Sequence, residues 1–139
     1  MSQVQLKIDG KSVDTKKRFN DGVWVDIKLN DEPIGLEFLI KSRHSDVGEK
    51  VSRTIQRRQQ ALFQKTGKFS LPDPEDKERQ RIDVLAVLIT SWRGPAISDD
   101  AGVAPQFTEV ALRDFLSRET WMLDQLDAVT GDDGRFLRP

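Results

Sequence analysis

The sequence predicts an α+β fold, with a small N-terminal antiparallel β ribbon of two or three strands followed by about four helices that form the main core. Three observations predict it: alternation of apolar and polar residues is confined to the first third, helical spacing dominates the rest, and capping residues separate the helical segments. The 139 residues fit a single domain. We expect a ribbon (1–42), a helical part (45–131) and a loose tail (132–139).

The ribbon is predicted from three alternating runs. The clearest is VWVDIKL (23–29), and a four-residue break (30–33) separates it from a second run (34–40), which is typical of a hairpin. A shorter run (4–8) adds a possible third strand. Because so small a sheet is not stable alone, its apolar face needs helices packed over it.

A basic amphipathic helix is predicted from about 46 to 65. Ser45 is its expected N-cap, and Gly67 lies near its end. Its apolar stripe consists of Val47, Val51, Ile55 and Leu62, with Phe63 beside it, and its opposite face carries Lys50, Arg53, Arg57 and Arg58.

The next helix should form the centre of the core. Asp73 and Pro74 are typical of a helix start, and a charged stretch, EDKERQR, follows them. The segment 82–92, IDVLAVLITSW, is apolar nearly all round, so it should be surrounded by protein. We expect the helix to continue to Trp92; a buried strand is the competing interpretation, because Ile, Val and Thr favour strands.

The last third is predicted to be helical. Thr108 is expected to cap one helix, and a second helical segment, which holds Trp121, should end near Gly131. Trp92 and Trp121 occupy positions consistent with the core. The tail DDGRFLRP (132–139) has too little apolar content to bury itself, so we expect it to be loose.

Composition excludes several classes of protein. The chain contains no cysteine, which removes disulfide and thiolate chemistry. It has no apolar run of about 20 residues and no signal-like N-terminus, so a soluble cytosolic protein is expected. The net charge of −1 is unevenly spread: residues 41–60 carry six basic and two acidic side chains, and residues 82–139 carry five basic and ten acidic ones. These regions could attract each other within or between copies, which leaves self-association open.

The sequence offers no catalytic, cofactor or metal signature, so an enzyme is not expected. His44 is the single histidine, and its spacing singles out no partner for nucleophilic catalysis. The SDDAG segment (98–102) lacks the alternating oxygen ligands of an EF-hand and is interpreted as a turn. No glycine lies in a phosphate-binding motif.

Partner binding is the more productive hypothesis. The basic helix could contact phosphates, but the lack of an aromatic platform or recognition helix favours a solvated face or a contact with an acidic protein surface. Trp24 points away from its apolar neighbours, so it is either an exposed interaction residue or part of a second buried face. The candidate partner-binding residues are Trp24, Lys50, Arg53, Arg57 and Arg58.

The stretch WRGPAISDDAGVAPQFTEVAL (92–112) is predicted to be a structural corner. Here Trp92 and Phe107 should pack from its two ends, and Thr108 should bond free amides of the next helix. Together with GVWVDI and FLSRETWMLDQL, this stretch resembles the tail assembly chaperones of long-tailed bacteriophages. The positions that carry the resemblance are Trp92, Gly94, Asp100, Gly102, Pro105, Phe107 and Thr108.

The resemblance implies a non-enzymatic assembly factor. Such chaperones bind the tape measure protein, keep it soluble while tail tube protein polymerises around it, act in the host bacterial cytoplasm, and are absent from the mature virion. Two alternatives remain open. One is a structural tail or head–tail connector component, and the other is a small nucleic-acid-binding protein.

Overall fold

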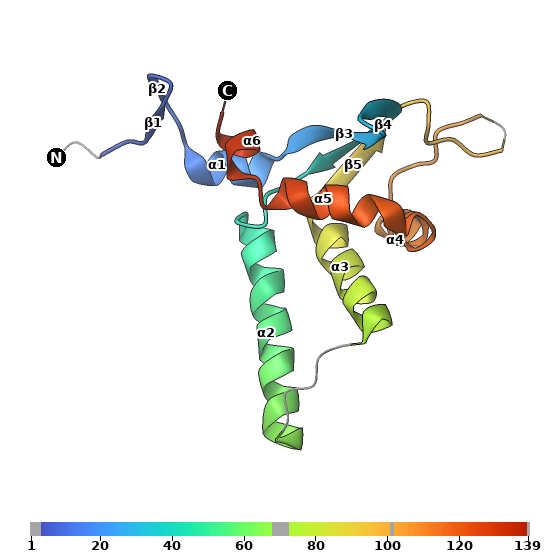
Figure 1. Ribbon diagram of the computed structural model, residues 1–139. Coiled ribbons are helices and arrows are strands. Elements are labelled where there is room, and N and C mark those ends of the chain that lie inside the picture. Colours follow the sequence, from blue (N-terminus) through green and yellow to red (C-terminus); the bar gives the residue numbers. More distant parts are fainter. Residues whose placement is uncertain (1–3, 68–72, 101, 139) are drawn as a thin grey trace.

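Helices and strands combine in an α+β architecture, as the sequence predicts (Figure 1). The computed structural model describes residues 4–67, 73–100 and 102–138. A short hairpin, β1 (Lys7–Ile8) and β2 (Lys11–Ser12), precedes a three-stranded sheet of β3 (Val23–Leu29), β4 (Glu32–Ile40) and β5 (Ile89–Arg93). The helices are α1 (Thr15–Asp21), α2 (Asp46–Thr66), α3 (Pro74–Leu88), α4 (Glu109–Arg118), α5 (Leu123–Thr130) and α6 (Asp133–Leu137), with a 3-10 turn, η1 (Thr120–Met122).

The predicted hairpin is confirmed as β3 and β4, which pair antiparallel. Its turn is tighter than the four-residue break in the sequence, because Asn30 and Asp31 alone take positive φ values of 52° and 65°. Two central residues with positive φ match the twist of paired strands. As a result β4 begins at Glu32 rather than at Ile34.

The core lies between one face of the sheet and the helices packed against it (Figure 1). Alternate strand residues point to this face, as the pleat requires. Burying them together with helix residues removes apolar surface from water, which is the main stabilising contribution to such a fold. The fully buried members include Ile27, Phe38 and Ile40 of the sheet, and Leu85, Leu88, Leu112, Leu116 and Leu126 of the helices.

The helix predicted through Trp92 is wrong at its end. The helix α3 stops at Leu88, and residues 89–93 form β5, so the competing strand interpretation is correct there. Pairing with β4, in which Ile89 lies opposite Ile40, satisfies the backbone of this β-branched stretch. The expected burial is confirmed, because Ile82, Leu85, Leu88, Ile89 and Trp92 all lie in the core.

Two polar segments form helices that the sequence does not predict. The helix α1 is capped by Asp14, whose Oδ1 accepts a hydrogen bond from the Lys17 amide at 3.1 Å. The tail predicted to be loose forms α6, and its Phe136 is 1% exposed. The rings of Phe136 and Phe19 lie 6.1 Å apart, so each segment supplies the apolar partner that the other lacks. Residue 139 lies outside the described residues.

Helix boundaries set by capping residues are confirmed. Ser45 accepts a hydrogen bond from the Gly48 amide, Asp73 accepts one from the Asp76 amide, and Gly67 ends α2 with a φ of 69°. One placement at the C-terminal end is wrong: Trp121 is 42% exposed and donates its indole N–H to Glu119 at 2.9 Å. A tryptophan at helical spacing therefore need not face the core.

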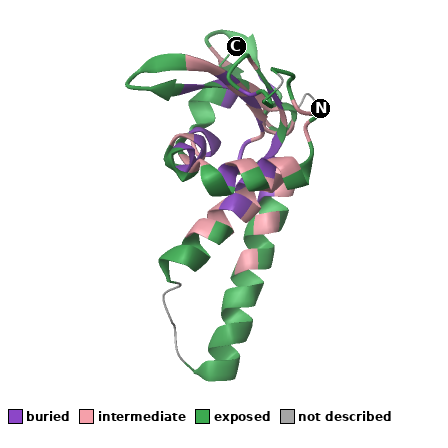
Figure 2. Cartoon of the chain, turned by 90° about the vertical axis from the view of Figure 1, so that its right-hand side faces the viewer, coloured by how far each residue is buried: buried purple, intermediate pink, exposed green. Residues whose placement is uncertain are grey.

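The helix α2 projects from the sheet-bearing body, with α3 beside its root (Figures 1 and 2). At 1.5 Å per residue its 21 residues span about 31 Å. Gly48 is its only buried residue, and every residue from 56 to 66 is exposed. Burial is concentrated in the body instead (Figure 2).

Candidate functional site

The candidate partner-binding surface lies on the projecting helix. Here residues 50–66 of α2 are called the α2 arm. The four basic residues predicted for partner binding, Lys50, Arg53, Arg57 and Arg58, are all exposed, and Lys65 adds a fifth cation that sequence analysis did not single out. The arm contains no acidic residue. None of its five cations forms an ion pair with another described residue.

An apolar stripe runs along the same helix, and its residues become more exposed towards the tip. Val47 packs against the core, and Val51 and Ile55 are half-buried. Leu62 is 58% exposed and Phe63 is 39% exposed. The predicted apolar stripe, with Phe63 beside it, is therefore partly covered at its start and exposed at its end.

A signal for this exposure was present in the sequence. The neighbouring helix α3 begins with Pro74 and continues with EDKERQR, so its first turns offer no apolar side chain to cover the tip of α2. Residues 73–77 are accordingly exposed, just as the arm is. The buried part of α3 starts at Ile82.

Trp24 belongs to a different surface from the arm. It lies on the outer face of the sheet and is 37% exposed, so the exposed interpretation holds in part. The Arg93 guanidinium lies over its ring, 3.8 Å from the centroid, which is a cation–π contact. The predicted partner-binding residues therefore form two surfaces, one on α2 and one on the sheet.

The same sheet face carries a polar row across all three strands. Asp26, Glu37 and Arg93 lie opposite one another on β3, β4 and β5, and Arg93 donates to Glu37. This hydrogen bond, with a further one involving Asp26, holds the pKa of Glu37 below its usual value of 4.5. The charge of Arg93 is therefore committed to contacts within the chain.

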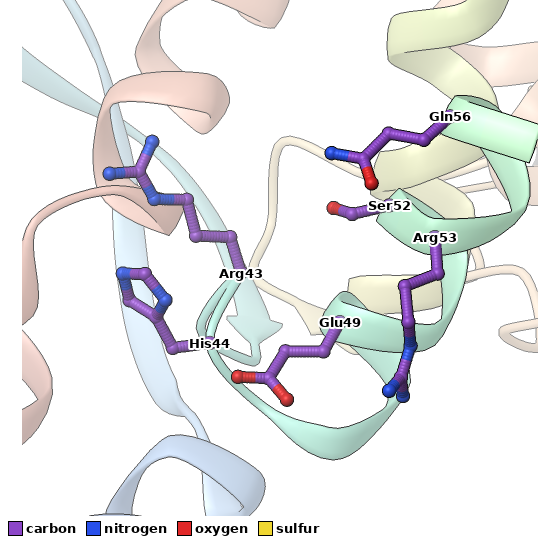
Figure 3. A pocket seen from close by; sticks show the side chains of 6 residues that line it. All are labelled: Arg43, His44, Glu49, Ser52, Arg53 and Gln56. Atoms are coloured by element: carbon purple, nitrogen blue, oxygen red, sulfur yellow. The ribbon is translucent and has the colours of Figure 1, made fainter. Parts of the chain in front are cut away.

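An open hollow lies where the chain passes from β4 into α2 (Figure 3). Its volume is about 320 Å³, and Arg43, His44, Glu49, Ser52, Arg53 and Gln56 line it, all of them exposed. His44 sits at the strand-to-helix junction, and its Nε2 is 3.5 Å from Asp133 Oδ1. The lining residues carry charges of both signs and are all exposed to solvent. A ligand in this hollow would therefore remain in contact with water.

The predicted corner is confirmed as a packed unit. Trp92 is 8% exposed, and its ring meets Phe107 edge-on with centroids 5.2 Å apart. The Trp92 indole N–H donates to the Pro105 carbonyl at 3.0 Å. Thr108 Oγ1 accepts a hydrogen bond from the Ala111 amide at 3.0 Å, which caps α4 as expected. The correction is that Trp92 enters this corner from a strand rather than from a helix.

Glycine is required at one position of the corner for two reasons. Gly94 has a φ of 120°, and a Cβ there would collide with the Gly35 carbonyl oxygen. Gly102 also has positive φ, 80°, but nothing lies within 4 Å of its Cβ position. Asp99 Oδ1 accepts a hydrogen bond from the Val103 amide at 2.9 Å, as the predicted turn requires, while Ala101 of SDDAG lies outside the described residues.

Arginines in the helical body are ion-paired, unlike those of the arm. Arg81 of α3 donates to Asp124 and Asp127 of α5 at 2.6 and 2.5 Å. Burial lowers the pKa of Arg81, but the hydrogen bonds to these carboxylates more than offset it, so the pKa is raised. Arg113 of α4 is likewise bonded to Asp83 and Glu109.

Two further classes of site are not found in the part of the chain that the structure describes. Within residues 4–67, 73–100 and 102–138, no group of three or more His, Cys, Asp or Glu side chains could hold a metal ion. No described helix is both long enough and apolar enough to cross a membrane. In comparisons with known proteins, no family model, curated protein or solved structure matched this chain.

Proposed function

We propose that this protein is a tail assembly chaperone of a long-tailed bacteriophage or prophage, which binds the tape measure protein and keeps it soluble during tail assembly. One observation carries the proposal: towards the tip of α2 the apolar Leu62 is 58% exposed and Phe63 is 39% exposed, on a stretch (56–66) in which every residue is exposed. A charged, helical protein can shield the apolar stripe of another helix from water by binding that stripe with its own exposed apolar residues.

The corner supports the same proposal. Trp92, Pro105, Phe107 and Thr108, which carry the resemblance to this chaperone family, make contacts within one corner of the fold. Their role is structural, since they join β5 to α4 without using any residue of the arm. The arm thus remains available for a partner.

The proposed activity is non-enzymatic. The protein would act in the host bacterial cytoplasm before the tail tube protein polymerises, and it would be absent from the mature virion. A structural tail or connector component would instead remain in the virion, so mass spectrometry of purified phage particles separates these two functions.

The decisive experiment measures aggregation of a tape measure segment. The segment, encoded by the same phage or prophage, is diluted from denaturant with and without this protein, and light scattering is followed. We expect scattering to be suppressed at roughly equimolar protein. Equal scattering with this protein and with an unrelated acidic protein of similar size would refute the proposal.

A further inference from the structure

The α2 arm combines an apolar tip with charges that form no ion pair within the described part of the chain, and this combination restricts what can bind it. Sequence analysis placed Arg58 on the face opposite the apolar stripe, which is wrong, because it lies one helical turn before Leu62. Lys65 lies one turn after Leu62, so both cations flank the exposed leucine. The arm carries five cations and no acid. The first turns of α3 carry Glu75, Asp76 and Glu78, but among the described residues none of these acids forms an ion pair with the arm.

The stripe on α2 also continues an existing contact. It starts at Val47 on the core, passes through the half-buried Val51 and Ile55, and reaches Leu62 in solvent. An isolated helical segment as short as residues 56–66 is marginally stable in water, and helices in proteins gain most of their stability from packing. A partner lying along the stripe would therefore extend a contact that already begins at the root.

We propose that the α2 arm is a docking surface for an amphipathic helix whose apolar stripe is bordered by acidic side chains. The partner helix would place its apolar residues on Leu62 and Phe63, and its carboxylates beside Arg58 and Lys65. The identity of the partner as a tape measure segment rests on the proposed function, whereas the chemistry of the surface does not.

Charge distinguishes this occupant from the alternatives. Two arms from two copies would bring five cations against five, which opposes pairing. A nucleic acid would neutralise the cations but leave Leu62 in water, since phosphates offer it no apolar contact. A lipid surface requires a larger apolar face than the tip offers, because binding strength scales with buried apolar area.

The test uses the full-length protein and two designed peptides of about 20 residues, long enough for a stable helix. Both peptides carry leucine at helical spacing; one has glutamate beside the leucines and the other has lysine. Fluorescence anisotropy should show binding of the glutamate peptide, at least about tenfold tighter than the lysine peptide. Its affinity should fall as salt is raised, because the exposed charges are screened.

Two arm variants and two matched controls locate the surface. Leu62→Asp and Arg58→Glu should each weaken binding of the glutamate peptide by at least about tenfold, and Arg58→Glu should shift preference towards the lysine peptide. The controls are Val110→Asp on α4, at a side chain that is 79% exposed, and Arg18→Glu on α1, also exposed. They should leave binding unchanged, and circular dichroism should show all four variants folded.

Several outcomes would overturn the inference. It fails if neither peptide binds, if both bind equally, or if the controls weaken binding as much as the arm variants. It also fails if duplex DNA or anionic vesicles bind the arm in preference to the glutamate peptide.

The two proposals can fail separately. If the glutamate peptide binds the arm but the tape measure segment still aggregates, the function is wrong and the surface stands. If Leu62→Asp and Arg58→Glu suppress aggregation as well as the unaltered protein does, the function stands and the arm is not the surface responsible.

Discussion

The α2 arm and the helices α3, α4 and α5 of the body differ in how their side chains are used. In the body, leucines such as Leu112 and Leu116 are fully buried, and Arg81 and Arg113 bond carboxylates of their own chain. In the arm, Leu62 is exposed, and the cations have no ion-pair partner among the described residues. The same residue types therefore stabilise the fold in one region and are exposed to solvent in the other.

The largest test of this difference compares two leucines at helical positions. Leu112→Ala in α4 removes a side chain that is 0% exposed and should destabilise the protein by about 2–5 kcal/mol. Leu62→Ala, at 58% exposed, should change the free energy of unfolding by less than about 0.5 kcal/mol. Urea denaturation measures both. A large loss for Leu62→Ala would mean that the arm is part of the folded core.

A second comparison uses the two glycines at the ends of α2. A Cβ at Gly48 would collide with the Arg43 backbone carbonyl, so Gly48→Ala should cost about 2 kcal/mol or more despite the better helix propensity of alanine. Gly67 has nothing within 4 Å of its Cβ position. Gly67→Ala should cost only about 1 kcal/mol, from the left-handed φ of 69°.

Thermal and urea unfolding of both glycine variants check this expectation. A Cβ at Gly48 meets the Arg43 backbone, whereas one at Gly67 meets nothing within 4 Å, so the order of the two losses matters more than their sizes. An equal loss at both positions would show that α2 is held along its whole length.

What the sequence predicts well are features that local chemistry decides. Ser45, Asp73 and Thr108 cap helices because a side-chain oxygen can reach an unpaired amide a few residues on, and this depends on nearby residues alone. The β3–β4 hairpin follows from alternation in the same way. The α+β class is predicted from these features together.

What the sequence does not predict depends on partners far along the chain. Residues 89–93 become a strand because β4, about 50 residues earlier, offers an edge for pairing. Phe136 is buried because Phe19 lies across from it. Leu62 is exposed because the first turns of α3 carry no apolar side chain that could cover it. The spacing of apolar residues within α2 alone gives no information about the neighbouring helix.

The third test compares arginines. Arg81→Ala removes bonds to Asp124 and Asp127 and should destabilise the protein by about 1 kcal/mol or less, since its side chain is 36% exposed and water screens the pair. Arg58→Ala should not change stability measurably. If the proposed surface is correct, the effects reverse in peptide binding, where Arg58→Ala weakens the interaction and Arg81→Ala does not.

Chemical denaturation gives the first pair of values and fluorescence anisotropy with the glutamate peptide gives the second. Repeating denaturation at high salt should reduce the loss for Arg81→Ala, because added ions weaken exposed pairs. A loss for Arg58→Ala equal to that for Arg81→Ala would imply an unrecognised partner for the arm within the chain.

The smallest effect concerns acid, and it should be confined to the body. The hydrogen bond from Arg93 keeps the pKa of Glu37 below 4.5, so the folded state favours its charged form. The resulting stability is fully present above about pH 4.5 and is lost as pH falls through the lower pKa of the folded protein. Glu37→Gln should therefore flatten this part of the stability-against-pH curve. The arm has no carboxylate, so acid should not weaken peptide binding through the arm itself. Protonation of the peptide's own glutamates is measured separately and subtracted. A fall in binding that remains would show that an acid of this chain contributes to the surface.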